Sequence, residues 1–207
     1  MAHRTSWLAV PMLIAAAAAA QSLDEGLLDP TWFSAGPLAF RTTDEIDYFW
    51  VKDSLSLAGR SLHIQDWSDP VFLGKQRDAK DAAKASSVTE QMPGLLRGAL
   101  STSLKGVTVS RQEGDIAVTG RVVDCNAGSK GAKFLVGMGA GSASATWDLK
   151  FTDVGTGELL LAVHHRAISG TMMSEIEDKV IKWLEEFGAL LVGDPAAAYA
   201  RAKPAKK

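Results

Sequence analysis

The sequence predicts an α+β fold: a two-layer sandwich with a mostly antiparallel sheet and two helices on one of its faces. The first observation is a strand at residues 143–152, in which apolar and polar side chains alternate without a fault before a glycine turn. The second is a pair of amphipathic stretches at helical spacing, over residues 78–104 and 172–191. The third is the order of elements along the chain, which is strand, helix, strand, strand, strand, helix.

Length and charge narrow the class of protein. A chain of 207 residues suits one domain with a substantial core, and its hydrophobic fraction of 46% is ordinary for a globular protein. The formal net charge is −2, and neither a basic stripe nor an acidic block is present. We therefore expect no nucleic-acid partner and no solvating acidic tail.

Residues 1–20 have the features of a secretory signal peptide. Arg4 gives a positive start, an apolar run extends from Leu8 to Ala20, and alanines supply the small residues of a cleavage site before Gln21. A short buried N-terminal helix is the alternative. No later stretch reaches the ~20 apolar residues of a membrane helix, and no cysteine near the cleavage site could carry a lipid. We expect an exported protein, periplasmic or extracellular, that is soluble after cleavage.

Residues 21–56 are expected to form an aromatic arm that packs onto the domain. Several large rings lie there between glycines and prolines, and periodicity is poor until a short strand expected near residues 48–52. Core filling is the favoured role of the rings. The alternative is a ligand groove or a partner surface, which clustered aromatic side chains can also mark.

The α+β domain is expected over residues 57–192. Its first strand, at residues 57–67, ends before Pro70, and a long helix follows over residues 78–104. Pro93 lacks the amide that the helical ladder needs, so it either kinks or divides this helix. The short apolar segment at residues 71–73 is expected to form either a strand or a loop that packs against the core.

The remaining strands are predicted at residues 107–109, 115–124 and 158–168, around the central strand. The hairpin turn after the central strand contains glycines that permit a positive φ. The apolar side chains of the central strand should form the floor for the two helices: Ala143, Ala145, Trp147, Leu149 and Phe151. After the second helix, residues 193–207 form a small, basic tail that we expect to be disordered.

The glycine run before the central strand invites a nucleotide-binding interpretation that its context excludes. A phosphate-binding glycine loop follows a strand and opens a helix, whereas these glycines lead into a strand. Two interpretations stay open. The glycines allow a helix or a neighbouring backbone to approach closely, or the segment is an apolar contact for a partner. Its residues are Phe134, Leu135, Val136, Gly137, Met138, Gly139 and Gly141.

No catalytic or metal-binding motif is found in the sequence. His164 and His165 are adjacent and would face opposite sides of a strand, so they could not bind one metal together. Cys125 is the only cysteine, which excludes an intramolecular disulfide. It is either a small buried strand residue, which we favour, or a reactive thiol. We expect no cofactor and no metal.

At the glycine run the chain resembles a group of uncharacterised bacterial envelope proteins, many of them lipoproteins, built on a domain of unknown function. The resemblance rests on V-G-x-G-x-G-S-A at residues 136–143, D-x-x-T-G-E at residues 153–158 and V-x-G-x-V-x-D at residues 118–124. It covers about residues 57–192 and implies no catalytic residues. The missing lipidation cysteine departs from the group and favours a soluble form.

Two functional hypotheses follow from these features. The preferred one is a non-enzymatic exported domain that binds another envelope protein or a second copy of itself, through residues 134–141. The alternative is a small-ligand binder or an enzyme with a cleft between the aromatic arm and the sheet. That cleft would lie around Trp50, His63 and Trp67.

Overall fold

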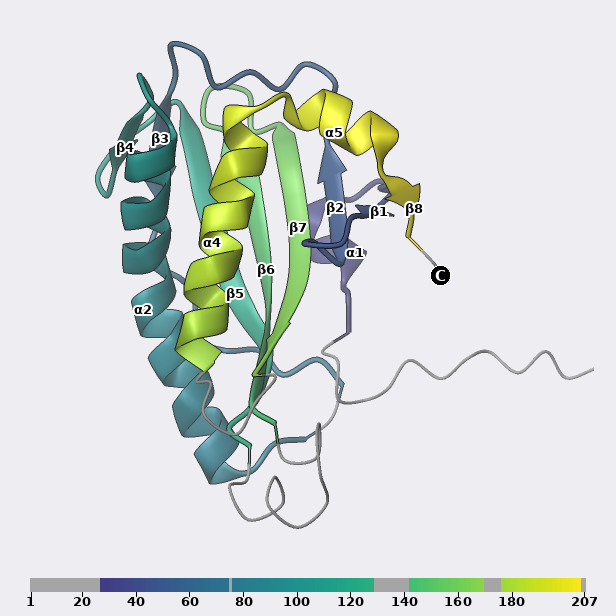
Figure 1. Cartoon of the computed structure of the whole chain (residues 1–207), viewed down its shortest axis with the longest axis vertical. Helices are drawn as coiled ribbons and strands as arrows, with labels where there is room; N and C mark the ends of the chain where they lie inside the picture. The colour runs from purple at the N-terminus through teal and green to yellow at the C-terminus, as the bar shows by residue number, and fades with distance from the viewer. Residues whose placement is uncertain (1–26, 75, 129–141, 170–175, 206–207) are drawn as a thin grey trace, which may run out of the picture.

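The computed structural model describes residues 27–74, 76–128, 142–169 and 176–205. These residues form one eight-stranded sheet in the order β4-β3-β5-β6-β7-β2-β1-β8, with helices α2 and α4 on one face (Figure 1). The predicted α+β class is confirmed. The elements are α1 (Pro30–Phe33), β1 (Arg41–Thr42), β2 (Tyr48–Val51), β3 (Ser61–Ile64), α2 (Ala79–Ser103), β4 (Thr108–Ser110), β5 (Ile116–Asn126), β6 (Ser144–Asp153), β7 (Leu159–Ile168), α4 (Ile176–Val192), α5 (Pro195–Arg201) and β8 (Lys203–Pro204).

Strands β5, β6 and β7 form the antiparallel centre of the sheet. The alternation predicted for the central strand is confirmed, because its aromatic side chains face helix α4. Trp147 meets Trp183 with ring centroids 5.1 Å apart, and Phe151 meets Phe187 at 6.1 Å. This aromatic layer holds α4 against the sheet.

Helix α2 continues through Pro93 and is not divided there. Its start is capped by Asp78, whose carboxylate accepts a hydrogen bond of 2.8 Å from the amide of Asp81. Met92 and Leu96, on either side of the proline, are almost completely buried. Burial of this stripe against the sheet offsets the loss of one helical hydrogen bond at the proline.

The sheet is mixed at one side. Strand β3 pairs in parallel with both β4 and β5, whereas the other ladders among the described strands are antiparallel. A parallel pair needs a long crossover connection, and α2 supplies it between β3 and β4. The arm contributes β1 and β2 to the opposite side, and β2 is the short strand expected near residues 48–52.

The other face of the central strand is also covered, which differs from the half-buried strand that its alternation suggests. Ser144, Thr146 and Asp148 all point away from the helices and are at most 2% exposed. Residues 27–40 of the arm run over this face, as the contact between Trp32 and Lys150 shows. Alternation of polar and apolar residues cannot reveal a cover that comes from a distant part of the chain.

Within residues 193–207, which the sequence predicts as a disordered tail, the structure has helix α5 and the short strand β8. Asp194 caps α5 by accepting from the amide of Ala197, and a proline occupies the first turn of that helix. Tyr199 packs edge-on against Phe49 with ring centroids 5.6 Å apart, and its hydroxyl donates to the carbonyl of Ala39. The composition of this segment does not reveal these contacts, because their partners, Phe49 and Ala39, lie in the N-terminal arm. Within the described ranges, no helix combines the length and apolarity that a membrane span requires.

Candidate functional site

Four polar side chains form one row across the centre of the sheet, on the face covered by the arm. Arg121 on β5 lies opposite Asp148 on β6, Asp148 lies opposite His164 on β7, and His164 lies opposite Tyr48 on β2. Directly opposed residues on adjacent strands have their side chains within contact distance. The register of the sheet therefore brings a cation, a carboxylate, an imidazole and a phenol together.

Asp148 is at the centre of this row and is completely buried. Its Oδ2 accepts a hydrogen bond of 2.7 Å from Nε of Arg121, and its Oδ1 lies 2.7 Å from Nδ1 of His164. Because a carboxylate can only accept, Nδ1 of His164 carries the hydrogen in this contact. Both oxygens are thus engaged, which compensates for the burial of the charge.

The arm closes over this row. Oδ2 of Asp29 lies 3.2 Å from a terminal nitrogen of Arg121, and the ring of Trp32 contacts both Arg121 and Lys150, at 4.6 and 4.2 Å from its centroid. Lys150 also donates a 2.8 Å hydrogen bond to the carbonyl of Trp32. Burial lowers the pKa of the Lys150 ammonium, and the nearby Arg121 lowers it further. The row is a closed polar core that attaches the arm to the sheet.

The adjacent histidines point to opposite sides, as the sequence predicts. His164 belongs to the buried row, whereas the ring of His165 stacks on Trp183 of α4 with centroids 5.1 Å apart. No group of three or more His, Cys, Asp or Glu side chains within the described ranges could hold a metal ion. Burial, and secondarily the charge of Asp124, raises the pKa of the Cys125 thiol to about 12. This thiol is buried and lacks the features of a reactive one.

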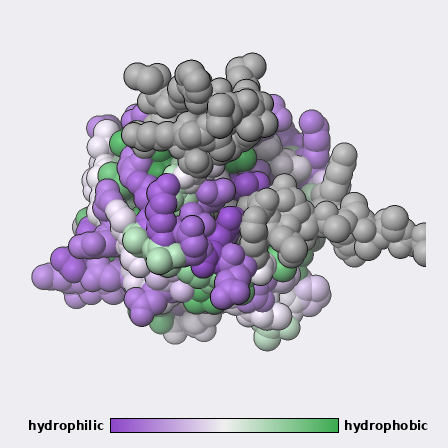
Figure 2. Space-filling view, turned by 90° about the horizontal axis from the view of Figure 1, so that it is seen from below, coloured by the Kyte–Doolittle hydropathy of each residue, from purple (hydrophilic) through white to green (hydrophobic). Residues whose placement is uncertain are grey.

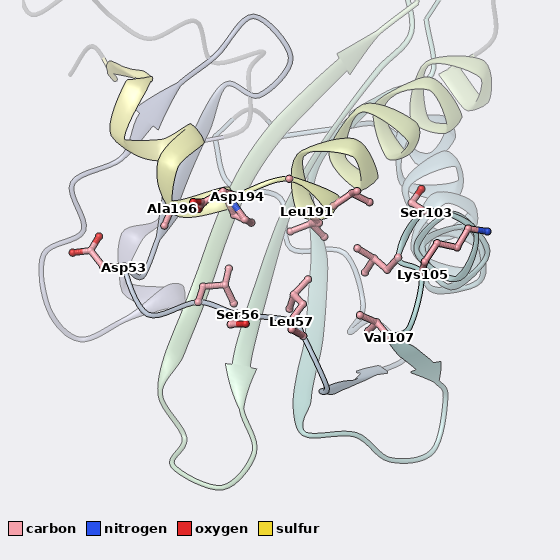
Figure 3. A pocket seen from close by; sticks show the side chains of 15 residues that line it. Asp53, Ser56, Leu57, Ser103, Lys105, Val107, Leu191, Asp194 and Ala196 are labelled. Carbon is pink, nitrogen blue, oxygen red and sulfur yellow. The ribbon is translucent and has the colours of Figure 1, made fainter.

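A cavity of about 550 Å³ lies where the C-terminal ends of α2 and α4 meet the loop between β2 and β3 (Figure 3). Ser56, Leu57 and Leu191 line its middle, whereas Asp53 and Lys105 point away from it. Leu57 and Leu191 are both buried in the core. The cavity is therefore a surface hollow over the hydrophobic core, with polar groups at its rim.

A second cavity of about 340 Å³ lies on the helix side of the sheet, between the segment that follows β3 and helix α2. Trp67, Thr89 and Pro93 line it, together with charged residues from both elements. The indole of Trp67 lies against Gly120, where an added Cβ would be 2.3 Å from ring carbon Cε2. Only glycine permits this close approach.

The three residues of the predicted ligand cleft are not brought together. Trp50 is on β2 and His63 is on β3, which are four strand spacings apart in the sheet, roughly 19 Å at ~4.8 Å each. Trp67 lines the cavity beside α2, on the helix side, and not a cleft under the arm. The arm contacts the face of the sheet through Trp32 and Asp29, whereas Trp50 is part of strand β2 within the sheet itself.

The predicted partner segment, residues 134–141, lies outside the described residues. Its anchors are described: β5 and β6 remain paired to Asn126 opposite Ser144, so residues 127–143 connect two adjacent strand ends. On the other side of Ser144 lies Ile168, which is 47% exposed. The described surface at this end of the molecule is mostly hydrophilic, with small separate hydrophobic spots (Figure 2).

Sequence reasoning missed the buried row because the register that aligns it was unknown. Nothing in the sequence marks Arg121 or Asp148 as a candidate site residue. One missed feature has a sequence signal: a proline inside a predicted helix leaves the carbonyl four residues earlier without its usual donor. That residue is Thr89, which lines the second cavity.

Comparison with known proteins gives one family match. The model of a domain of unknown function (DUF4410) matches residues 50–184. This match agrees with the resemblance to a domain of unknown function. The glycine run at residues 136–141 lies outside the described residues. No curated protein matches the chain.

Solved structures with a similar arrangement have low sequence identity. The PelC dodecamer from Paraburkholderia phytofirmans is 11% identical, with a TM-score of 0.42; the match covers 67% of this chain and 89% of that one. A DUF330 protein from Xanthomonas campestris is 10% identical, with a TM-score of 0.39; the match covers 66% of this chain and 82% of that one. Similarity at this level does not extend to function or assembly.

Proposed function

This chain belongs to the DUF4410 family of domains of unknown function, and we propose that it is a non-enzymatic exported domain that binds another envelope protein or a second copy of itself. The binding segment of this proposal is residues 134–141. Export rests on residues 1–20, which have a positive start, an apolar run and a small-residue cleavage site.

The length of the connection between β5 and β6 carries the proposal. Asn126 and Ser144 are directly opposed, and two residues would suffice to join such strand ends, yet residues 127–143 connect them. Loops longer than about 12–15 residues are uncommon in compact domains, and those that occur are usually functional or linker segments. From residue 134 onward the connection contains no charged side chain and several apolar ones, which favours contact with another apolar surface.

The surroundings of the connection support the same proposal. The described surface at that end is mostly hydrophilic (Figure 2), whereas the sequence of residues 134–138 is mostly apolar. The side chains most suggestive of chemistry, Asp148 and His164, are buried and bonded to each other. An acid and a base that are closed off in this way favour a structural role over catalysis.

The test compares two valine substitutions, one before strand β6 in the sequence and one directly after it. Val136→Asp introduces a charge into the proposed binding segment. Val154→Asp introduces the same charge in the turn between β6 and β7, where the valine is already 57% exposed. Size-exclusion chromatography with light scattering measures the molar mass of the purified protein and of both variants.

Self-association that is lost in Val136→Asp and retained in Val154→Asp would support binding to a second copy. A photo-crosslinking amino acid at position 136 tests the other arm in cells, where a specific envelope protein should be captured from that position and not from position 154. A strict monomer with no crosslink specific to position 136 would contradict the proposal. N-terminal sequencing of the exported protein should begin at Gln21.

A further inference from the structure

The cavity at the C-terminal ends of α2 and α4 is a surface hollow with apolar side chains at its middle and edge (Figure 3). Leu57 and Leu191 line its middle, and Val192, the last residue of α4, lines it while 58% exposed. Its volume of about 550 Å³ is within the range of sites that enclose a small ligand. A hollow of this kind favours contact with a few apolar side chains of a partner.

The charged residues around this cavity favour an uncharged occupant. Asp53 and Lys105 point away from it (Figure 3). The carboxylate of Asp194 is engaged as the cap of α5, where it accepts from the amide of Ala197 at 2.9 Å. A charged group inside the cavity would thus find no described lining side chain of opposite charge that is both free and directed toward it. Burying an unpaired charge is unfavourable.

One stretch of this chain has the matching chemistry. Residues 134–141 form the longest uncharged stretch after residue 20 that lies outside the described residues. They include four large apolar side chains, and their glycines allow another backbone to approach closely. The proposed function already assigns binding to this stretch.

The chain is too short to place these residues in its own cavity. They belong to the connection between β5 and β6, where the amide of Ala127 donates to Oδ1 of Asp81, in the first turn of α2, at 2.7 Å. The cavity is at the other end of that helix (Figure 1), and α2 rises about 33 Å from Asp81 to Ser103. Residue 135 is the midpoint between Ala127 and Ala143, eight residues from each, and eight residues span at most about 29 Å when fully extended.

We propose that the cavity at Leu57, Leu191 and Val192 binds residues 134–141 of a second copy of this chain. The contact joins opposite ends of two molecules, because the connection between β5 and β6 of one copy meets the ends of α2 and α4 of the other. This inference rests on the proposed function, since it names the surface that receives the binding segment and selects a second copy as the partner.

The test uses two variants that break opposite sides of the contact. Ser56 is exposed and lines the middle of the cavity, so Ser56→Asp adds a charge there without changing the core. Val136→Asp adds the same charge to the segment. Ser54→Asp is the matched control, because Ser54 is also exposed but does not line the cavity. Light scattering should show self-association at least about tenfold weaker in Ser56→Asp and Val136→Asp, and unchanged in Ser54→Asp.

A mixture of the two defective variants gives the sharper result. Val136→Asp keeps an intact cavity and Ser56→Asp keeps an intact segment, so an equimolar mixture should form a complex of two chains although neither variant associates alone. The remaining pair of surfaces would bring two aspartates together and stays apart. Binding of the segment to the same segment of another copy would not be restored by mixing.

Thermal unfolding shows whether Ser56→Asp is folded, and Ala58→Asp, at a second exposed lining position, should cause the same loss. Self-association that is lost in Val136→Asp but unchanged in both cavity variants, or a mixture that forms no complex, would overturn this inference and leave the proposed function standing. A monomeric parent protein whose position 136 crosslinks to a different envelope protein would have the same consequence. A strict monomer without any specific crosslink would contradict both.

Discussion

Asp148 and His164 lie directly opposite each other on β6 and β7, with Oδ1 of the carboxylate 2.7 Å from Nδ1 of the imidazole. The second oxygen of the same carboxylate is bonded to Arg121. This arrangement joins three strands through one buried charge. Arg121 also contacts Asp29 and Trp32 of the arm. Asp148 therefore contributes both to the stability of the sheet and, through Arg121, to the attachment of the arm.

Asp148→Asn should strongly destabilise the protein. The substitution keeps the size of the side chain but removes the buried counter-charge of Arg121 and leaves only the partly exposed Asp29 beside the guanidinium. Breaking a buried ion pair typically costs about 3–5 kcal/mol. Urea unfolding measures the change in the free energy of unfolding. Asp66→Asn is the matched control, because that carboxylate also pairs with an arginine but on the surface, where we expect little change. Equal effects of the two substitutions would contradict the structural role of Asp148.

Trp32→Ala should release the arm from the sheet. The ring contacts both Arg121 and Lys150, and each cation–π contact is worth about 0.5–1 kcal/mol or more when partly buried. Limited proteolysis should then cleave within residues 27–40 faster than in the parent protein. Trp32→Phe, which retains a ring, should give an intermediate rate. An arm that is cleaved equally fast in all three proteins would show that this ring does not hold it.

The carboxyl of Asp153 should make its full contribution to stability only above about pH 4. Its pKa is lowered to about 2, first by a hydrogen bond from Arg60 and then by the amide of Thr156. A carboxyl whose pKa is lower in the folded state stabilises the fold above its unfolded pKa of about 3.9, and loses that effect as the pH falls toward 2. Unfolding free energies of the parent and of Asp153→Asn should therefore differ at pH 6 and converge near pH 2. A difference that is independent of pH would exclude this origin.

Gly120→Ala should disrupt the contact between β5 and Trp67. The added Cβ would lie 2.3 Å from the ring, and overpacking of this kind costs about 1–3 kcal/mol. Gly98→Ala is the matched control in α2, where nothing lies within 4 Å of an added Cβ. That second change should stabilise the protein by about 0.5–1 kcal/mol, because glycine is unfavourable inside a helix. Thermal unfolding measures both, and opposite signs are expected.

Local patterns were sufficient for the elements that carry their own signal. The central strand, both long helices and the opposite orientation of His164 and His165 were predicted, because side-chain alternation and helical spacing reflect burial on one face. Pro93 was recognised as an interruption of the helical ladder. Whether it divides α2 depends on packing around the proline, which local sequence does not contain.

Pairings between distant segments were decided only in the tertiary structure. Arg121, Asp148 and His164 form one row because of strand register, and neither the spacing of these residues nor their types specifies that register. Strand order also separates Trp50 from His63, which the sequence grouped with Trp67 in one cleft. Helix α5 lies in the predicted tail, and its Tyr199 packs against Phe49 of the arm, a contact that composition does not reveal. The sequence by itself determined the fold class and its main elements, whereas non-local contacts decided which polar groups meet and which are closed off from solvent.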